Sequence, residues 1–366
     1  MRIGIITMHR VPNFGSALQA YALQKKLFQH GYDNRIIDYL YTYDDYNPTW
    51  WRRIFDKTKY HLKVLLRHPI FLTHFHKFRR RYLKTTWQEY TKQDLMNKKV
   101  PSFDVYMTGS DQVWNCRFTN GDTNFLLKFA PENAHRLSYG ASFASPSVPK
   151  QFESIFKEEL SKYDSILVRE RSAINIVKEL TGKKAEVVCD PTLLLTAQDY
   201  HALASKSKLK ISEPFILVYI LDYMYNPYPM VYGLKVVYIG TNKPDPTDKE
   251  CMYVGDKIGP LEFLKLMENA SFVITTSFHG TAFATIFHKP LLSVVQDTES
   301  EDGRMQTLLR DLQQDESLVS YNKTVSKELI HSPNIIAKED SLNAIRTRSE
   351  NLLVNSLKNI GYDENS

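Results

Sequence analysis

Short runs of apolar, β-branched residues alternate with amphipathic stretches along the first half of the chain. This alternation is typical of βαβ units, in which buried parallel strands are covered by helices. The longest amphipathic stretch, residues 15–30, ends before Gly31 and predicts a helix with Leu18, Ala22, Leu27 and Phe28 facing inward. In this half we expect strands at residues 2–7, 35–39, 104–108, 137–142, 165–169 and 186–189, and further helices at 152–162 and 172–180.

The pattern restarts after residues 194–212, a boundary in which Thr196 and Asp199 resemble a helix capping box. Beyond it we expect strands at 215–221, 236–239, 272–275 and 291–295, a helix at 259–269, and a polar surface helix at 342–360. The prediction is an α/β protein of two doubly wound, Rossmann-like domains that face a cleft. The expected bounds are 1–200 for the N-terminal domain, 213–335 for the C-terminal domain and 336–366 for a helical tail.

A basic segment interrupts the alternation and predicts a helical insertion at about residues 48–98. Residues 51–92 contain twelve Lys or Arg and two acidic residues, a net charge of +10, so the rest of the chain carries −4. The apolar residues of the segment are Trp50, Trp51, Phe55, Leu62, Leu65, Leu66, Ile70, Phe71, Phe75 and Phe78. Such a helix can lie on an anionic membrane surface, or it can pack on the domain and present its charges to water. Nucleic acid is not expected, because no recognition motif accompanies the charge.

Length and composition narrow the class of protein. The chain has 366 residues, enough for two domains, and its 43% hydrophobic and 24% charged content is that of a globular protein. The first residues do not read as a signal peptide, and no run of 18 apolar residues predicts a transmembrane helix. Three widely spaced cysteines fit a reducing cytoplasm and argue against a disulfide framework or a structural zinc site.

A histidine, His279, follows the predicted strand 272–275 at a turn from strand to helix. In open α/β sheets, ligands bind at the carboxyl ends of strands. A helix start offers free backbone N–H groups and a partial positive charge, which suit phosphate or carboxylate, and Gly280 would allow close approach. His279 is therefore a candidate for chemistry, although a polar turn with a capping histidine fits the same pattern.

Two other strand ends carry polar residues. The first strand leads to His9, Asn13, Gly15 and Ser16, which fit either an anion- or sugar-binding helix start or an ordinary cap. The pattern GxGxxG is missing there, so a dinucleotide is not expected.

The strand 104–108 leads to Asp111, Gln112 and Trp114. The two polar side chains can hydrogen-bond sugar hydroxyls, and Trp114 can face a pyranose ring or belong to the core. Arg169, at the end of another strand, can hold a phosphate or carboxylate through two parallel hydrogen bonds, or it can pair with Glu170 or Asp190.

Taken in order, these motifs resemble the polysaccharide pyruvyl transferase family. The matching elements are NFGSALQAYALQ from Asn13, GSDQVWN from Gly109, SYGASFA from Ser138, VRER from Val168, CDPTLLL from Cys189 and TTSFHGTAFATIFHKP from Thr275. The resemblance covers roughly residues 1–295 and implies a two-domain fold of the GT-B type. It also implies transfer of the enolpyruvyl unit of phosphoenolpyruvate to a sugar of a surface or capsular polysaccharide or its lipid-linked precursor, forming a cyclic ketal.

The resemblance assigns residues unevenly. The family's histidine falls on His279, while an Arg that some members place two residues earlier is replaced by Ser277. Arg169 or Arg304 is then expected to supply the missing charge on the donor.

A mechanism follows from these assignments. The donor phosphate is expected at the helix start of Gly280 and Thr281, His279 is expected to carry the proton, and Asp111 is the expected base toward the acceptor hydroxyl. The acceptor is expected to be a hexose of a lipid-linked or free saccharide, contacted by His9, Asn13, Gly15, Ser16, Gln112 and Trp114. No metal and no cofactor is expected, since neither HExxH nor a cluster of carboxylates occurs; phosphoenolpyruvate is a co-substrate.

Two rival functions fit the same pattern. A nucleotide-sugar glycosyltransferase would use the same two-domain cleft, because a fold does not fix a function. A non-catalytic saccharide-binding protein would be consistent with Ser277 in place of the family's Arg. For the enzyme, the basic segment would favour a place on the inner face of the cell membrane.

Overall fold

The N-terminal domain is built on a sheet of seven parallel strands. The computed structural model describes residues 1–41, 69–211, 213–221, 235–240, 250–255, 257–298, 303–321 and 335–363. The strands lie in the order β3-β2-β1-β4-β5-β6-β7, and every neighbouring pair is parallel. Their bounds are β1 Arg2–Ile6, β2 Asp33–Tyr39, β3 Thr85–Tyr90, β4 Val105–Thr108, β5 His135–Ala141, β6 Ser165–Val168 and β7 Glu186–Val187.

The C-terminal domain repeats this design with six parallel strands in the order β10-β9-β8-β11-β12-β13. Their bounds are β8 Ile216–Ile220, β9 Val236–Gly240, β10 Cys251–Tyr253, β11 Phe272–Thr275, β12 Leu291–Val295 and β13 Leu318–Ser320. In both sheets the strand order reverses next to the first strand, at β1/β4 and at β8/β11, which is where doubly wound sheets open a crevice for ligands. The predicted fold class is therefore confirmed.

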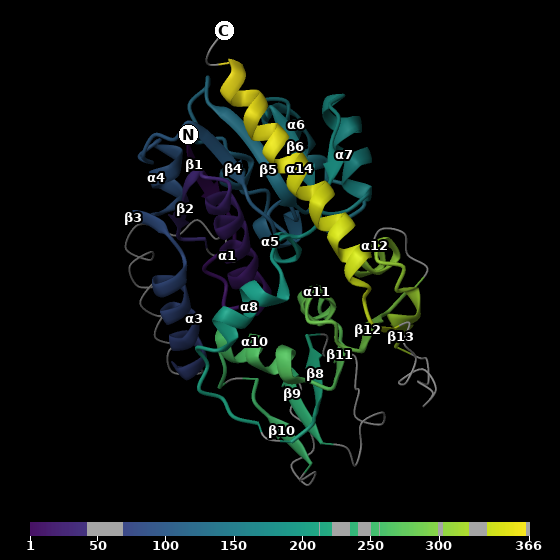
Figure 1. Cartoon of the computed structure of the whole chain (residues 1–366). Helices are drawn as coiled ribbons and strands as arrows, with labels where there is room; N and C mark the ends of the chain where they lie inside the picture. The colour runs from purple at the N-terminus through teal and green to yellow at the C-terminus, as the bar shows by residue number, and fades with distance from the viewer. Residues whose placement is uncertain are drawn as a thin grey trace.

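Helices cover the sheets and fill the space between the domains. Figure 1 shows the N-terminal domain above the C-terminal one, with α8, α10 and α11 between them. The helices are α1 Phe14–Gln29, α3 Pro69–Tyr82, α4 Lys92–Met96, α5 Cys116–Thr119, α6 Lys150–Leu160, α7 Ser172–Thr181, α8 Ala197–Ala204, α10 Pro260–Asn269, α11 Phe278–Ile286, α12 Arg304–Asp311 and α14 Glu339–Asp363. Three short 3-10 turns complete the described elements: η1 Thr123–Leu126, η2 Pro191–Leu194 and η3 Asp315–Ser317. The predicted capping box is present, since Thr196 and Asp199 cap α8 reciprocally.

One hydrophobic core continues from the first domain into the second. Phe14, at the start of α1, stacks on Phe263 of α10 with ring centroids 4.7 Å apart and packs edge-on against Tyr219 of β8. The same ring meets Phe75 of α3 at 5.4 Å. The amino end of α1 is thus fixed against the C-terminal domain, which places the loop after β1 in the cleft.

The last helix, α14, joins the two domains. It starts beside the C-terminal domain and runs back along the N-terminal one (Figure 1). Leu353, Leu357 and Ile360 of α14 are buried, so the helix packs on the first domain with one apolar face. The predicted polar surface helix at 342–360 is therefore helical, as expected, but it is partly a core element.

The basic segment differs from its prediction. It is not a continuous helical insertion, because β3 adds an edge strand to the sheet between α3 and α4. Phe75 and Phe78 are buried against α1, while Arg80 and Arg81 are exposed. Phe71 packs edge-on against Phe14 with ring centroids 6.0 Å apart. The other apolar residues of the segment lie outside the described residues or in a stretch without described side chains (Trp50, Trp51, Phe55, Leu62, Leu65, Leu66 and Ile70).

A second correction concerns α1. Phe28 was expected on its inward face but is 59% exposed, with the Lys84 ammonium 5.2 Å from its ring centre. Leu18, Ala22 and Leu27 are buried as predicted. No helix among the described residues is both long and apolar enough to cross a bilayer.

Candidate functional site

The turn between β11 and α11 holds His279 buried at the junction of the two domains, against the start of α1. Ser277 is the N-cap of α11, and its hydroxyl accepts a hydrogen bond from the Gly280 N–H at 3.3 Å. The Thr281 N–H donates to the Ser277 carbonyl at 2.9 Å, and the Thr281 hydroxyl bonds Ser293. The amides expected to receive a phosphate at Gly280 and Thr281 are thus already engaged within the turn, which corrects that part of the prediction.

The unpaired backbone N–H groups of α11 belong to the residues that precede Gly280. The N–H groups of Phe278 and His279 precede the first intrahelical hydrogen bond, so an anion at this end would meet them first. Gly280 has a packing role here, because a Cβ at this position would lie 2.2 Å from the Thr275 hydroxyl oxygen. Only glycine lets α11 lie this close to β11.

Asp190 organises the charges around His279. Its carboxylate accepts hydrogen bonds from Arg169 Nη1 at 2.8 Å and from the Ser110 hydroxyl at 2.9 Å. The Thr192 amide and hydroxyl donate to the other carboxylate oxygen at 3.0 and 2.8 Å. His279 Nε2 lies 3.6 Å from the oxygen that Arg169 contacts.

These neighbours keep Asp190 ionised although it is buried. Burial opposes the charge, but the contact with His279, the charges of His279 and Arg169 and the Thr192 N–H outweigh it and hold the pKa of Asp190 well below its ordinary value. A permanent negative charge at this place fixes the guanidinium of Arg169 through a charge-assisted hydrogen bond.

Asp111 reaches the same cluster from β4. Its backbone has a φ of 85°, an uncommon conformation for a residue other than glycine. Its carboxylate accepts a 2.5 Å hydrogen bond from the Ser16 hydroxyl and a 2.8 Å bond from the Gln112 N–H, and Arg169 Nη2 lies 4.0 Å away. The strained turn therefore aims Asp111 at the start of α1 and at Arg169.

Several nitrogen atoms of the cluster are buried and uncommitted. Among the described residues, Nε and Nη2 of Arg169 and Nε2 of His279 have no hydrogen-bond partner. Buried polar atoms are nearly always paired, so an open edge of a guanidinium beside an imidazole indicates a place for an anionic ligand.

A second arginine lies close by. The guanidinium carbons of Arg169 and Arg304 lie 4.9 and 5.7 Å from the ring centre of Phe278. Burial, followed by the charge of Arg169, lowers the pKa of Arg304 to about 10. Two cations thus share one aromatic ring at the start of α11, and an anion between them would relieve their repulsion.

The start of α1 touches the histidine directly. A Cβ at Gly15 would lie 1.9 Å from His279 Nδ1, so the imidazole packs on the α1 backbone. Asn13 caps α1 by accepting a hydrogen bond from the Ser16 N–H at 3.2 Å. Gly15 and Ser16, predicted for the acceptor side, therefore meet the two predicted catalytic residues, His279 and Asp111.

Three predicted site residues lie apart from this cluster or face away from it. Trp114 is 1% exposed and donates its indole N–H to the Phe125 carbonyl, so it belongs to the core and offers no ring face to a sugar. The Gln112 side chain accepts a hydrogen bond from Asn115. His9 bonds Asp38, away from Asp190, at 2.8 Å.

Sequence reasoning missed two parts of the site. Asp190 entered only as an alternative ion-pair partner, and Phe278 was not considered. The buried Glu170, also seen only as a partner of Arg169, instead accepts hydrogen bonds from the Phe143 and Ala144 amides. The signal for Asp190 was its place directly after a strand, in Cys-Asp-Pro-Thr.

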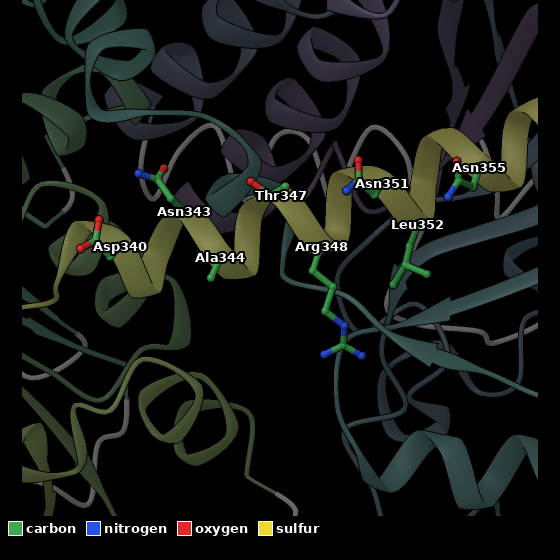
Figure 2. A pocket seen from close by; sticks show the side chains of 8 residues that line it. All are labelled: Asp340, Asn343, Ala344, Thr347, Arg348, Asn351, Leu352 and Asn355. Carbon is green, nitrogen blue, oxygen red and sulfur yellow. The ribbon is translucent and has the colours of Figure 1, made fainter.

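The concave surfaces of the described chain lie elsewhere. Figure 2 shows a shallow depression along α14, lined by Asp340, Asn343, Ala344, Thr347, Arg348, Asn351, Leu352 and Asn355. A second one lies near the amino ends of β1 and β2, around Asp33 and Trp87. Neither contains a residue of the His279 cluster, whose Asp190, Arg169 and His279 side chains are buried.

Comparison with solved structures identifies the fold. The chain is similar to UDP-GlcNAc 2-epimerase from Rickettsia bellii, with a TM-score of 0.54, 10% identity, and 99% of this chain and 97% of that chain covered. The enzyme from Neisseria meningitidis bound to UDP-GlcNAc gives 0.52, 10%, 98% and 100%, and that from Methanocaldococcus jannaschii gives 0.51, 14%, 94% and 98%. At these identities the likeness shows the fold alone, which is GT-B.

Sequence comparison identifies the family. No curated protein matches the chain. The sequence model for polysaccharide pyruvyl transferase matches residues 13–298, a span that runs from the N-cap of α1 to the end of β12 and beyond it. This span includes Asp111, Arg169, Asp190 and His279. The chain belongs to the polysaccharide pyruvyl transferase family.

Proposed function

We propose that the protein transfers the pyruvyl group of phosphoenolpyruvate to a hexose of a surface or capsular polysaccharide precursor and forms a pyruvate ketal. The observation that carries the proposal is the open edge of Arg169 beside His279, both placed by the ionised Asp190. Phosphoenolpyruvate carries a carboxylate and a phosphate, and both are groups that paired arginines and helix starts bind.

The donor would be held by two cations. Nε and Nη2 of Arg169 form one side of the planar guanidinium and suit a carboxylate, since Nη1 is already bound to Asp190. Arg304 and the N–H groups at the start of α11 would receive the phosphate. Arg304 then supplies the charge that Ser277 lacks.

His279 would act on the donor as a general acid. A proton passes from His279 to the methylene carbon of phosphoenolpyruvate, and the neighbouring carbon becomes cation-like. One acceptor hydroxyl attacks that carbon while its proton passes to Asp111. Asp190 lies 3.6 Å from the imidazole Nε2.

Ring closure would restore both groups. The bond between the central carbon and the phosphate oxygen breaks, and the phosphate leaves with the proton held by Asp111. A second acceptor hydroxyl then attacks the same carbon, and its proton returns to His279. The products are one cyclic ketal and one phosphate.

The acceptor would be a lipid-linked or free saccharide, and the site of action the cytoplasm. We propose peripheral contact with the inner face of the membrane through the basic segment, in which Arg80 and Arg81 are among the exposed cations of α3. Neutralising these two residues together with Arg79 should weaken binding to anionic vesicles, and unchanged binding would remove this part of the proposal.

The test of the donor is thermal stability of the purified protein with phosphoenolpyruvate and, separately, with nucleoside diphosphates. A ligand at 100 times its dissociation constant stabilises by about 2.7 kcal/mol, which moves a melting temperature by a few degrees. We expect a shift with phosphoenolpyruvate that Arg169→Gln abolishes. Arg171→Gln is the matched control, since Arg171 is exposed and pairs with Asp311 at the surface.

The other outcomes decide between functions. A shift with a nucleotide alone would favour glycosyl transfer and overturn the proposal. Normal turnover by His279→Ala with phosphoenolpyruvate still bound would remove His279 from the mechanism. Saccharide binding that ignores both phosphoenolpyruvate and the loss of His279 would favour a non-catalytic binding protein.

A further inference from the structure

A second group of charged side chains lies at the carboxyl edge of the N-terminal sheet, on the opposite side of β1 from Asp111. Arg10 follows β1, Asp38 lies on β2 and Glu89 on β3, where the register pairs it with Asp38. Arg10 Nε donates to Asp38 at 2.6 Å and Arg10 Nη2 to Glu89 at 2.5 Å. His76 and Arg79 of α3 face this pair and are close enough to experience its charges.

The carboxylates of this group are already engaged. Glu89 holds Arg10, and Asp38 holds both Arg10 and the imidazole of His9 at 2.8 Å. Among the described residues, the half-buried Arg79 has no carboxylate within ion-pair distance. Its Nη2 lies 3.1 Å from Nδ1 of His76, so a guanidinium donates to a neutral imidazole instead.

The electrostatics agree with an unfilled anion site. Burial, and after it the charge of Arg10, lowers the pKa of Arg79 although Asp38 and Glu89 act in the opposite direction. Burial, followed by the charges of Arg79, Arg80 and Arg10, lowers the pKa of His76. A phosphate oxygen between these groups would replace a weak neutral partner with a charged one.

We propose that Arg10, His76 and Arg79 form a second anion site, which binds a phosphate or diphosphate group of the saccharide acceptor. The group is recessed, since the Arg10 side chain is 14% exposed, yet it opens to solvent at His76 and Glu89. A single phosphate on a flexible acceptor can enter such a recess.

The position of the site fits an acceptor that spans the cleft. The loop after β1 lies between the two clusters: Thr7 bonds the Ser110 carbonyl beside Asp111 and Asp190, and His9 and Arg10 bond Asp38 on the other side. A glycosyl phosphate held at Arg10 and Arg79 could therefore extend its sugar over this loop toward Asp111. The identity of the acceptor rests on the proposed function, whereas anion binding at this site does not.

The test uses histidine imidazole NMR of the full chain, with His76 identified by the signal lost in His76→Gln. Inorganic pyrophosphate is the probe. We expect saturable binding that raises the pKa of His76 by about one unit, because an opposite charge within a few ångströms favours the imidazolium. Arg79→Gln should weaken pyrophosphate binding about tenfold, the effect of one lost charge-assisted hydrogen bond. Arg81→Gln, an exposed arginine of the same helix, should leave it unchanged.

Three results would overturn the site. One is a His76 signal that does not respond to millimolar pyrophosphate, and another is an equal loss of affinity in Arg79→Gln and Arg81→Gln. The third is a response to anionic vesicles but not to pyrophosphate, which would assign the group to lipid headgroups.

A further variant separates this inference from the proposed function. Arg169→Gln should abolish the thermal response to phosphoenolpyruvate and leave the His76 response to pyrophosphate intact. If Arg169→Gln loses only the response to phosphoenolpyruvate, the variant affects the donor site alone. If it loses only the His76 response to pyrophosphate, it affects the acceptor site alone.

Discussion

At the scale of single residues, Asp190 has the largest electrostatic role, because one buried carboxylate places both Arg169 and His279. Asp190→Asn should lower the free energy of unfolding at pH 7 by about 3 kcal/mol, the cost of leaving a buried cation without its partner. The folded pKa of Asp190 lies well below the ordinary value of 3.8, so its stabilisation is present above that value and is lost as the pH falls toward the folded pKa. The difference in melting temperature between wild type and variant should therefore begin to shrink as the pH falls below about 4.

Asp311→Asn is the control for that measurement. Asp311 pairs with Arg171 at 2.5 Å, but the Arg171 side chain is 65% exposed, so the loss should stay below about 1 kcal/mol. An Asp190→Asn variant that melts like Asp311→Asn at pH 7 would show that Asp190 has no such role.

Gly15 gives a prediction whose sign depends on its neighbour. In a helix, Gly→Ala ordinarily stabilises by up to about 1 kcal/mol, but here the new Cβ would overlap His279 Nδ1. Gly15→Ala should therefore destabilise the wild type and remove activity by displacing the imidazole. In a His279→Ala background the same change should be neutral or stabilising, and urea unfolding of the four proteins measures the coupling.

One result would contradict the predicted coupling between Gly15 and His279. If Gly15→Ala destabilises both backgrounds equally, the α1 backbone does not pack on the His279 imidazole.

At the scale of elements, α14 fastens the second domain to the first through Arg346. Its Nε donates to the Leu193 carbonyl at 3.0 Å and its Nη2 reaches the Leu195 carbonyl at 3.5 Å, beside the turn that carries Asp190. Arg346→Ala should cost about 2 kcal/mol of unfolding free energy, because buried carbonyls lose their donor. Arg348→Ala, two residues along the same helix, is the comparison: its side chain is 62% exposed and its change should cost no more than about 0.5 kcal/mol. Equal losses in denaturant titrations would mean that α14 is held by its apolar face alone.

How far the elements could be predicted depends on their length and burial. The longer apolar strands and amphipathic helices appear where the periodicity predicts them. A strand that is buried on both faces, such as 272–275, is a continuous apolar run and is therefore recognisable in the sequence. β10 and β13 have three residues each, too few for a period, and β3 is a half-exposed edge strand inside a basic stretch. The charged residues around β3 hide its strand pattern in the sequence, although β3 belongs to the sheet.

The site was predictable to the same extent. Arg169 ends a predicted strand, Asp111 and His279 follow predicted strands after short turns, and the carboxyl ends of parallel strands meet at one edge. The pairing of Arg169 with Asp190 joins residues 21 positions apart, and the contact of Gly15 with His279 joins two domains. Such contacts depend on how the domains dock, which no local pattern encodes. Trp114 was misplaced because an aromatic residue at a strand end fits a core as well as a sugar site.

At the scale of the whole molecule, the two sheets share one core, in which residues of α1, β8, α10 and α11 form a single apolar cluster. A shared core of this kind couples the domains, so the chain should unfold in one calorimetric transition although it contains two sheets. The His279 cluster lies at this junction, between the start of α1 and the start of α11. Its geometry therefore depends on the same packing that couples the domains.

Phe14 tests this dependence, since its ring stacks on Phe263 across the junction. Phe14→Ala should remove about 3–5 kcal/mol and split the single transition into two, because it deletes the ring that joins the halves. Phe156→Ala removes a ring of the same size, 1% exposed, from a cluster confined to the N-terminal domain, so it should lower the melting temperature and keep one transition. Two transitions already in the wild type would show that the domains unfold independently, whereas the same calorimetric profile for both variants would show that Phe14 does not couple them. If the domains unfold independently, they can separate without loss of either core. The contact of Gly15 with His279 would then describe only one arrangement of the two domains.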